Sequence, residues 1–215
     1  MKQRQEILTQ ILYSRFGKGE ILGNSIEPGD LVKAGIMNEV FRTYKRLGGI
    51  LNHLPLSFGK WDICLNGFIV ELDEEQHFNR YRTITLDSYI YHLENGFDIF
   101  AYKKYCLDNE LCCLAKSSWG KYWTSPSTEK QFGLPGPKGD LNGNGSPRWK
   151  QRAFYDYLRD LYSMIYKIPL LRISVYDKIH IKKQLKVVGS ILSEACSDDL
   201  KELVNFIERK TNQLI

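Results

Sequence analysis

Apolar residues recur along the chain at two periods, 3.6 and 2, and these periods predict helices interrupted by strands. Residues 2–16 have helical spacing. A second helix is marked by five apolar positions: Met37, Val40, Phe41, Tyr44 and Leu47. We expect Asp30 to cap this second helix and Gly48-Gly49 to end it. Residues 83–116 mix aromatic and polar positions and are also predicted to be helical.

After residue 116 the spacing of apolar residues is irregular, and a regular helical spacing returns only after residue 148. Residues 117–148 are rich in Gly, Pro, Asn and Ser, which predicts a long loop. The next helix has an apolar face made of Phe154, Tyr157, Leu158, Leu161 and Ile165. Ile168-Pro169 ends it, and residues 170–175 alternate as a strand. A final helix is expected from about Asp198. Helices before and after a sheet predict an α/β or α+β protein.

The clearest local signal is the stretch WDICLNGFIVELD at 61–73. An Asn-Gly pair flanked by alternating apolar residues predicts a hairpin with a two-residue turn. Positions paired across this turn sum to 133, so Asp62 faces Glu71 and Lys60 faces Asp73. Alternation puts these four charged residues on one face of the hairpin. The other face is predicted to be buried and consists of Trp61, Ile63, Leu65, Phe68, Val70 and Leu72.

The facing acids Asp62 and Glu71 are the first candidate for chemistry. They fall on a non-hydrogen-bonded pair, where Cα atoms approach to about 4.5 Å, and like charges directly opposite each other destabilise a hairpin. A bound divalent metal resolves the repulsion, because Mg²⁺ takes oxygen ligands and completes its octahedron with water and phosphate. Two other interpretations stay open: Lys60 as a structural counter-ion, and a solvated acid face. A bulged turn would separate the pair.

Composition narrows the class of protein without assigning a function. The 215 residues are 43% hydrophobic and 26% charged, as in a soluble globular protein. The sequence has no run of about 18 apolar residues, so we expect no membrane partner. The first residues are too polar for a secretory signal, and five cysteines without a CxxC pair favour a reducing cytoplasm. The net charge of +5 permits an anionic partner.

Two segments resemble the PD-(D/E)XK nuclease superfamily, in the branch akin to very-short-patch repair and small phage-type endonucleases. The first segment reads WDIC at 61–64 and ELDEEQHF at 71–78, which has the form E-x-D-x-E-Q-H-F. In the second segment, Asp156 and Arg159 precede the apolar run IPLLRI at 168–173. Either segment alone is a weak signal, whereas the two in this order are more specific.

The resemblance implies one nuclease domain over residues 1–215. Its fold would be α/β, with a restriction-endonuclease-like mixed β-sheet core flanked by helices and a large insertion. The core would lie at about 31–82 and 149–180. The insertion would occupy about 83–148, and a helical extension would follow at about 181–215.

The resemblance also implies an activity: an Mg²⁺-dependent endonuclease, with Mn²⁺ able to substitute, that hydrolyses DNA in restriction, defence or a mobile element. Its metal ligands would be Asp62 and Glu71, the pair that the hairpin already indicates. Asp73, Gln76 and His77 would complete the catalytic set. Histidine suits a general base or a phosphate contact, because it exchanges protons near neutral pH. The alternative for Gln76 and His77 is structural hydrogen bonding at the strand end.

Two departures from the family pattern bear on the mechanism. Asp73 stands where a lysine usually follows the second acid, and Glu74 replaces the expected glycine. Lys60, on the same face as Asp73, is a candidate for the missing cation. These departures leave room for an alternative function, a catalytically inactive nucleic-acid-binding or partner subunit that kept the fold. A homodimer would suit double-strand cleavage.

Further residues are candidates for supporting roles. Glu39 corresponds to an acid that relatives place near the metal, although a solvated position is favoured. Asp156, Arg159 and Arg152 share a helix face, which would either support Glu71 and His77 or form exposed salt bridges. Arg80, Arg82 and Arg152 are candidate nucleic-acid contacts. Aromatic residues of the insertion would stack on bases or form a small core: Trp119, Tyr122, Trp123, Phe132 and Trp149.

Overall fold

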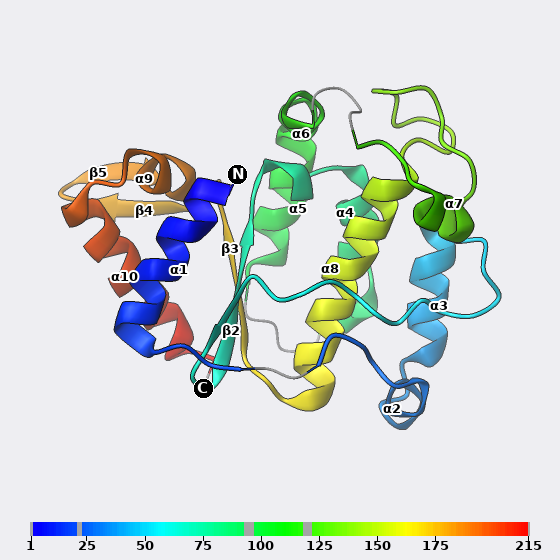
Figure 1. The fold of residues 1–215 in the computed structure, drawn as a ribbon, viewed down its shortest axis with the longest axis horizontal. Helices are drawn as coiled ribbons and strands as arrows, with labels where there is room; N and C mark the ends of the chain where they lie inside the picture. The colour runs from blue at the N-terminus through cyan, green and yellow to red at the C-terminus, as the bar shows by residue number, and fades with distance from the viewer. Residues whose placement is uncertain (1, 21–22, 93–96, 118–121, 215) are drawn as a thin grey trace. The chain divides into compact units, whose positions relative to one another are not determined.

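A computed structural model describes residues 2–20, 23–92, 97–117 and 122–214 (Figure 1). It combines helices with small sheets, which confirms the α/β class. The chain forms two compact units. Unit 1 consists of Met1–Gly23, Lys60–Glu74 and Lys167–Ile215, and unit 2 consists of Asn24–Gly59 and Glu75–Tyr166. Within the described part of the chain, every helix is too short or too polar to span a lipid bilayer.

Unit 1 contains the strands. In chain order its elements are α1 (Lys2–Phe16), β1 (Ile63–Leu65), β2 (Phe68–Asp73), β3 (Leu170–Ser174), β4 (Lys178–Ile181), β5 (Gln184–Val187), α9 (Val188–Glu194) and α10 (Ser197–Thr211). One sheet has the order β1-β2-β3, with β1 antiparallel and β3 parallel to β2. The other sheet is the antiparallel hairpin β4-β5. The first sheet is therefore mixed, as predicted.

The core of unit 1 joins α1 to the sheet and to the C-terminal helices. Leu8 and Leu12 of α1 are fully buried, as are Ile63 and Val70 of the first hairpin. α1 packs against β1, α9 and α10. α10 is the predicted final helix, and it carries acidic residues in its first turn and basic residues in its last, as the helix macrodipole favours.

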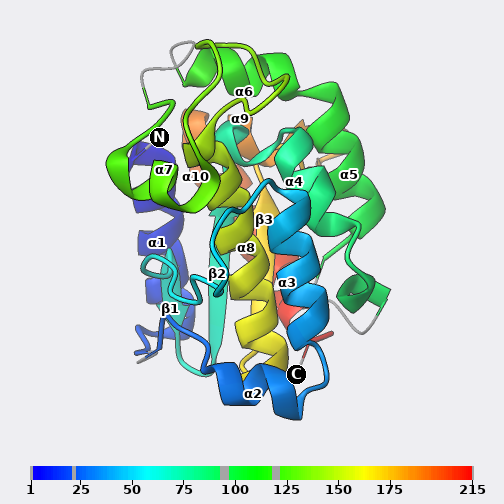
Figure 2. The same ribbon diagram turned by 90° about the vertical axis from the view of Figure 1, so that its right-hand side faces the viewer.

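Unit 2 is helical. Its elements are α2 (Pro28–Lys33), α3 (Met37–Arg46), η1 (Glu75–His77), α4 (Arg80–Leu86), η2 (Tyr89–His92), α5 (Ile99–Asp108), α6 (Glu110–Lys116), α7 (Pro126–Phe132) and α8 (Pro147–Tyr166). The long helix α8 contacts α4 and α7 and runs through the middle of this unit (Figure 2). Its predicted apolar face is confirmed for Phe154, Tyr157, Leu158 and Leu161, which are fully buried, whereas Ile165 is half-buried.

Two predictions of local structure in unit 2 are wrong. Asp30 caps no helix: it lies inside α2, and its carboxylate accepts a hydrogen bond from the Tyr166 hydroxyl at 2.8 Å. The segment 117–148 is not all loop, because α7 forms within it. Ser125 and Thr128 make a reciprocal capping box, and Pro126 begins the helix, so a local start signal was present.

Candidate functional site

The register of the first hairpin places Asp62 across from Glu71, as predicted. Ile63 pairs with Val70 and Leu65 with Phe68, so the pairs sum to 133. Asp62 directly precedes β1. At this open end of the hairpin, hydrogen bonds between side chains and the backbone join the two strands. The backbone N–H of Asp62 donates to Oε1 of Glu71 at 2.9 Å, and Oδ2 of Asp62 accepts from the N–H of Leu72 at 3.1 Å. Each acid is thus tied to the opposite strand.

A glutamine from another element also fixes Asp62. The Gln5 side-chain amide, on α1, donates to Oδ1 of Asp62 at 3.0 Å. The named donors to the two acids, Gln5 and two backbone amides, are all neutral. These hydrogen bonds orient the two carboxylates toward the opposite strand and toward α1.

The acids do not lie on a solvated face. Every residue of β2 is buried, with Glu71 exposing 2% and Asp73 1% of its surface. The solvated-face interpretation of Glu71 and Asp73 is wrong because β2 is the middle strand and pairs in parallel with β3. Parallel sheets are covered on both faces. Buried carboxylates require a compensating partner, since an isolated charge is costly to remove from water.

Arg172 of β3 provides that partner for Asp73. Its guanidinium donates to both Asp73 carboxylate oxygens, at 2.8 and 3.0 Å, and the side chain is fully buried. The register pairs Arg172 with Glu71, so Glu71, Asp73 and Arg172 share one face of the sheet. Lys60, the predicted cation, is exposed. An arginine inside the apolar run IPLLRI was the signal that sequence reasoning missed, because a charge in a buried strand implies an acid beside it.

In unit 2, His77 is bound to a carboxylate. Nδ1 of His77 lies 2.8 Å from Oδ2 of Asp156, and Asp156 also forms an ion pair with Arg159 at 3.5 Å. An ionised carboxylate only accepts hydrogen bonds, so in this contact Nδ1 of His77 is the donor and Asp156 the acceptor. The His77 side chain is 21% exposed, whereas Asp156 is buried. Asp156 therefore contacts His77 as predicted, and its supporting role in a catalytic site stays a prediction.

Gln76 is fixed on both ends of its amide. Its Oε1 accepts from Arg152 at 2.7 Å, and its Nε2 donates to the Lys116 carbonyl at 3.4 Å. Burial lowers the pKa of Arg152, and the nearby Asp156 carboxylate opposes that shift. Arg152 is half-buried and holds Gln76, so its described contact is internal. A nucleic-acid contact by Arg152 stays a prediction.

The two other predicted arginine contacts differ from expectation. Arg82 exposes 2% of its surface and binds Asp160 at 2.8 Å and the Tyr91 hydroxyl at 3.2 Å. Its prediction as a phosphate contact is wrong, because the guanidinium serves a buried ion pair. Arg80 is exposed but engaged: its Nη2 lies 2.6 Å from Oε1 of Glu110. Hydrogen bonds to Glu110 raise the pKa of Arg80, so it remains charged.

Glu39 is not solvated, contrary to the favoured expectation. It exposes 4% of its surface and accepts a hydrogen bond from the Ser88 hydroxyl at 2.5 Å. Ser88 in turn contacts the Tyr157 hydroxyl at 2.9 Å, and burial raises the pKa of Tyr157 to about 12. Arg42 pairs with Glu39 from the same helix. These contacts give Glu39 a structural role within unit 2.

The described aromatic residues of the insertion mainly form a small core. Trp123, Phe132 and Trp149 are buried, and the two tryptophan rings meet edge to face with centroids 5.4 Å apart. Tyr122 is exposed and lies beneath the Arg148 guanidinium. Trp119 lies outside the described residues. The small-core interpretation is therefore confirmed for the three buried rings, which leaves no face of theirs for a base.

The predicted site residues fall into two sets. Asp62, Glu71 and Asp73 come together in unit 1, where Gln5 and Arg172 join them. Gln76 and His77 belong to unit 2, where Arg152 and Asp156 hold them. The union of both sets in one site stays a prediction. Gln5 had no signal in the sequence, because 57 residues separate it from the aspartate that it contacts.

The chain thus has a mixed α/β fold, with a buried acidic face in one unit and a histidine–carboxylate pair in the other. A protein-family model described as "Family of unknown function (DUF7255)" matches residues 42–194. Because that match covers well over half of the 215 residues, the chain belongs to this family. Searches of curated proteins and of solved structures find no match.

Proposed function

We propose that this chain is a metal-dependent endonuclease that hydrolyses phosphodiester bonds in DNA. The observation that carries the proposal is the facing pair Asp62 and Glu71, with Glu71 buried and both carboxylates oriented by hydrogen bonds from Gln5 and two backbone amides. A restriction, defence or mobile-element enzyme of the cytoplasm, acting on DNA as a homodimer, is the fuller form of the proposal.

The donor set suits Mg²⁺. Carboxylate oxygens are hard ligands, and magnesium sites use one or two of them together with water and substrate phosphate. Asp62 and Glu71 face each other across the hairpin, and a cation held by both would relieve the repulsion between two carboxylates. When bound, Mg²⁺ supplies a more acidic water and offsets charge on the phosphoryl oxygens. Mn²⁺ has the same ligand preference and is expected to substitute.

The chain's own groups then have defined tasks. Asp62 and Glu71 hold the cation, and Gln5 fixes the orientation of the Asp62 carboxylate. His77 is proposed as the general base, and Asp156 orients its ring through the contact at Nδ1. Asp156 also stabilises the imidazolium that forms when Nε2 takes a proton, as an orienting carboxylate does in catalytic triads.

The fold supports the family resemblance at the level of its sheet. An antiparallel hairpin carrying both acids pairs in parallel with a third strand, and that strand is the IPLLRI segment of the resemblance. We propose that this sheet is the centre of a restriction-endonuclease-like core. The position of Arg172 on the third strand explains why the segment carries a charge among apolar residues.

Cleavage of supercoiled plasmid in Mg²⁺ tests the proposal. Asp62→Asn and Glu71→Gln keep the side-chain volume and remove one charge each, so we expect each to reduce the cleavage rate by at least about 100-fold. Glu6→Gln is the matched control, because Glu6 is an exposed acid on α1 of the same unit. Cleavage that survives both site substitutions, with the fold intact by circular dichroism, contradicts the proposal.

A second function is favoured by one observation: the family's lysine position holds Asp73, whose partner is the buried Arg172. A chain without an accessible cation there would bind nucleic acid and fail to cut it. The same plasmid experiment separates the two functions. DNA retention by the parent chain without cleavage in either Mg²⁺ or Mn²⁺ supports the inactive nucleic-acid-binding subunit.

A further inference from the structure

The hairpin β4-β5 of unit 1 turns at two lysines. Ile181 pairs with Gln184, which leaves Lys182 and Lys183 as the two turn residues. Both have positive φ, 46° for Lys182 and 70° for Lys183. This backbone region is unfavourable for residues with a Cβ, and two-residue turns with both φ positive strongly prefer Asn-Gly. The turn therefore keeps two lysines at a cost in backbone strain.

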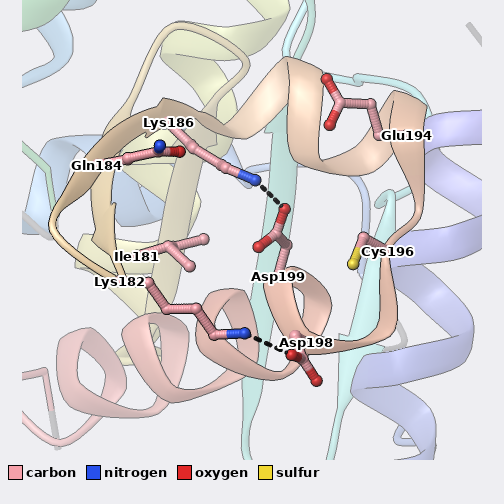
Figure 3. A pocket seen from close by; sticks show the side chains of 8 residues that line it. All are labelled: Ile181, Lys182, Gln184, Lys186, Glu194, Cys196, Asp198 and Asp199. Carbon is pink, nitrogen blue, oxygen red and sulfur yellow. Dashed lines mark hydrogen bonds and ion pairs between the residues drawn. The ribbon is translucent and has the colours of Figure 1, made fainter.

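The inner face of this hairpin is bound to α10. Ile179 and Ile181 are buried, and Figure 3 shows Lys182 and Lys186 reaching to Asp198 and Asp199 at the start of the helix. The Lys182 pair is 2.6 Å long. The hydrogen bond to Asp198 raises the pKa of Lys182, so this lysine stays protonated. These contacts hold the base of the turn against α10.

The outer face and the tip carry charge that the neighbouring acids do not offset. Lys178 and His180 are exposed on the outer face, and Lys183 is exposed at the tip. Within the described residues no ion pair involves Lys178 or Lys183. Residues 176–187 hold four lysines against one aspartate, a net charge of +3 in a chain whose total is +5. Asp198 and Asp199 of α10 offset Lys182 and Lys186, so the charge that the ribbon presents to solvent lies on Lys178 and Lys183.

We propose that this ribbon binds the phosphate backbone of duplex DNA through Lys183 at its tip and Lys178 on its outer face. The proposal rests on the proposed function in taking DNA as the partner. A two-stranded antiparallel ribbon fits the major groove of B-DNA, and lysines along it reach the flanking phosphates. Lys182, held by Asp198, fixes the shape of the tip.

The strain distinguishes this proposal from a merely solvated surface. If the lysines only kept the turn soluble, Asn-Gly would make the same turn without left-handed lysines. Strained backbone conformations that persist in a fold are concentrated at functional positions. A phosphate contact that needs positive charge at the tip of the ribbon would explain why the strained turn keeps two lysines.

The test uses a variant whose two effects have opposite directions. In Lys182→Asn/Lys183→Gly the turn loses its strain, so the melting temperature should rise by a few degrees. The variant also loses two cations, so its affinity for a fluorescein-labelled duplex should fall at least about fivefold at low salt. The slope of log affinity against log salt should become shallower by about one to two. Fluorescence anisotropy in EDTA measures binding without cleavage.

Lys167→Gly is the matched control. Lys167 is also an exposed lysine with positive φ, at 55°, in the same unit but outside the ribbon. It should change the melting temperature in the same direction and leave DNA affinity unchanged. Lys178→Ala should weaken DNA binding without the gain in melting temperature, because Lys178 lies in a regular strand.

Three results overturn the proposal. The first is parent-like DNA affinity in the double variant, and the second is an equal loss of DNA affinity in Lys167→Gly. The third is a double variant that loses binding to phosphatidylserine vesicles but keeps its binding to the duplex. A parent chain that binds no duplex overturns it as well. The proposed nuclease activity is judged separately. Cleavage with parent-like binding in the double variant rejects the ribbon alone, whereas ribbon-dependent binding without cleavage rejects the nuclease alone.

Discussion

Two hairpins of the same compact unit reverse the chain with opposite chemistry. β1-β2 turns at Asn66-Gly67, where the left-handed residue is a glycine with φ of 91°. β4-β5 turns at Lys182-Lys183, where both left-handed residues are lysines. The first hairpin has an unstrained turn and carries its charged residues into a buried sheet. The second has a strained turn and keeps its charged residues in solvent.

The two hairpins differ in which of their features is energetically unfavourable. In β1-β2 the cost lies in burying like charges, and hydrogen bonds, an arginine and the proposed cation offset it. In β4-β5 the cost lies in the backbone, and exposed ion pairs to α10 offset little of it. An acid pair with Glu71 buried and Asp62 half-buried suits metal binding, whereas an exposed basic ribbon suits a polyanion.

The largest expected effect concerns the buried charges of the first sheet. Arg172→Met removes the partner of a fully buried aspartate, and breaking such a pair costs about 3–5 kcal/mol of unfolding free energy. Urea denaturation followed by circular dichroism measures it. Arg15→Met is the control, since Arg15 pairs with Glu208 at the surface and its removal should cost about 0.5 kcal/mol or less. A loss below about 1 kcal/mol for Arg172→Met would contradict the buried-pair assignment.

A smaller effect is expected at the unstrained turn. Gly67→Ala forces a Cβ into the left-handed region and should cost about 1 kcal/mol. No atom lies within 4 Å of the added Cβ, so the cost comes from the backbone alone. Gly29→Ala also meets open space but has no positive φ, and it should be neutral or stabilising in its helix. Equal losses at both positions would remove the contrast between the two turns.

Local signals allowed the sequence to predict the first hairpin and most helices. The Asn66-Gly67 turn specified the register without any long-range contact, and the apolar face of α8 followed from its 3.6-residue period. The second hairpin lacked any such signal, because Lys182-Lys183 contains neither asparagine nor glycine. Its turn is supported by tertiary contacts to α10 that no local window contains.

The candidate site was predictable in its acids and not in their partners. Asp62 and Glu71 were identified because one short turn brings them together. Their burial depends on β3, which follows β2 by almost 100 residues, and so does the Asp73–Arg172 pair. The surroundings of a charged residue, which decide whether it is solvated or buried, are set by such distant segments. That is why Arg82 and Glu39 were also placed wrongly.

Isothermal titration with Mn²⁺ tests the central claim most directly, because it needs no knowledge of the DNA target. The parent chain and the Glu6→Gln control should bind one Mn²⁺ and gain melting temperature with metal concentration. The double variant Asp62→Asn/Glu71→Gln should show neither effect. Equal Mn²⁺ binding by the parent and the double variant would contradict the assignment of the facing acids as a metal site.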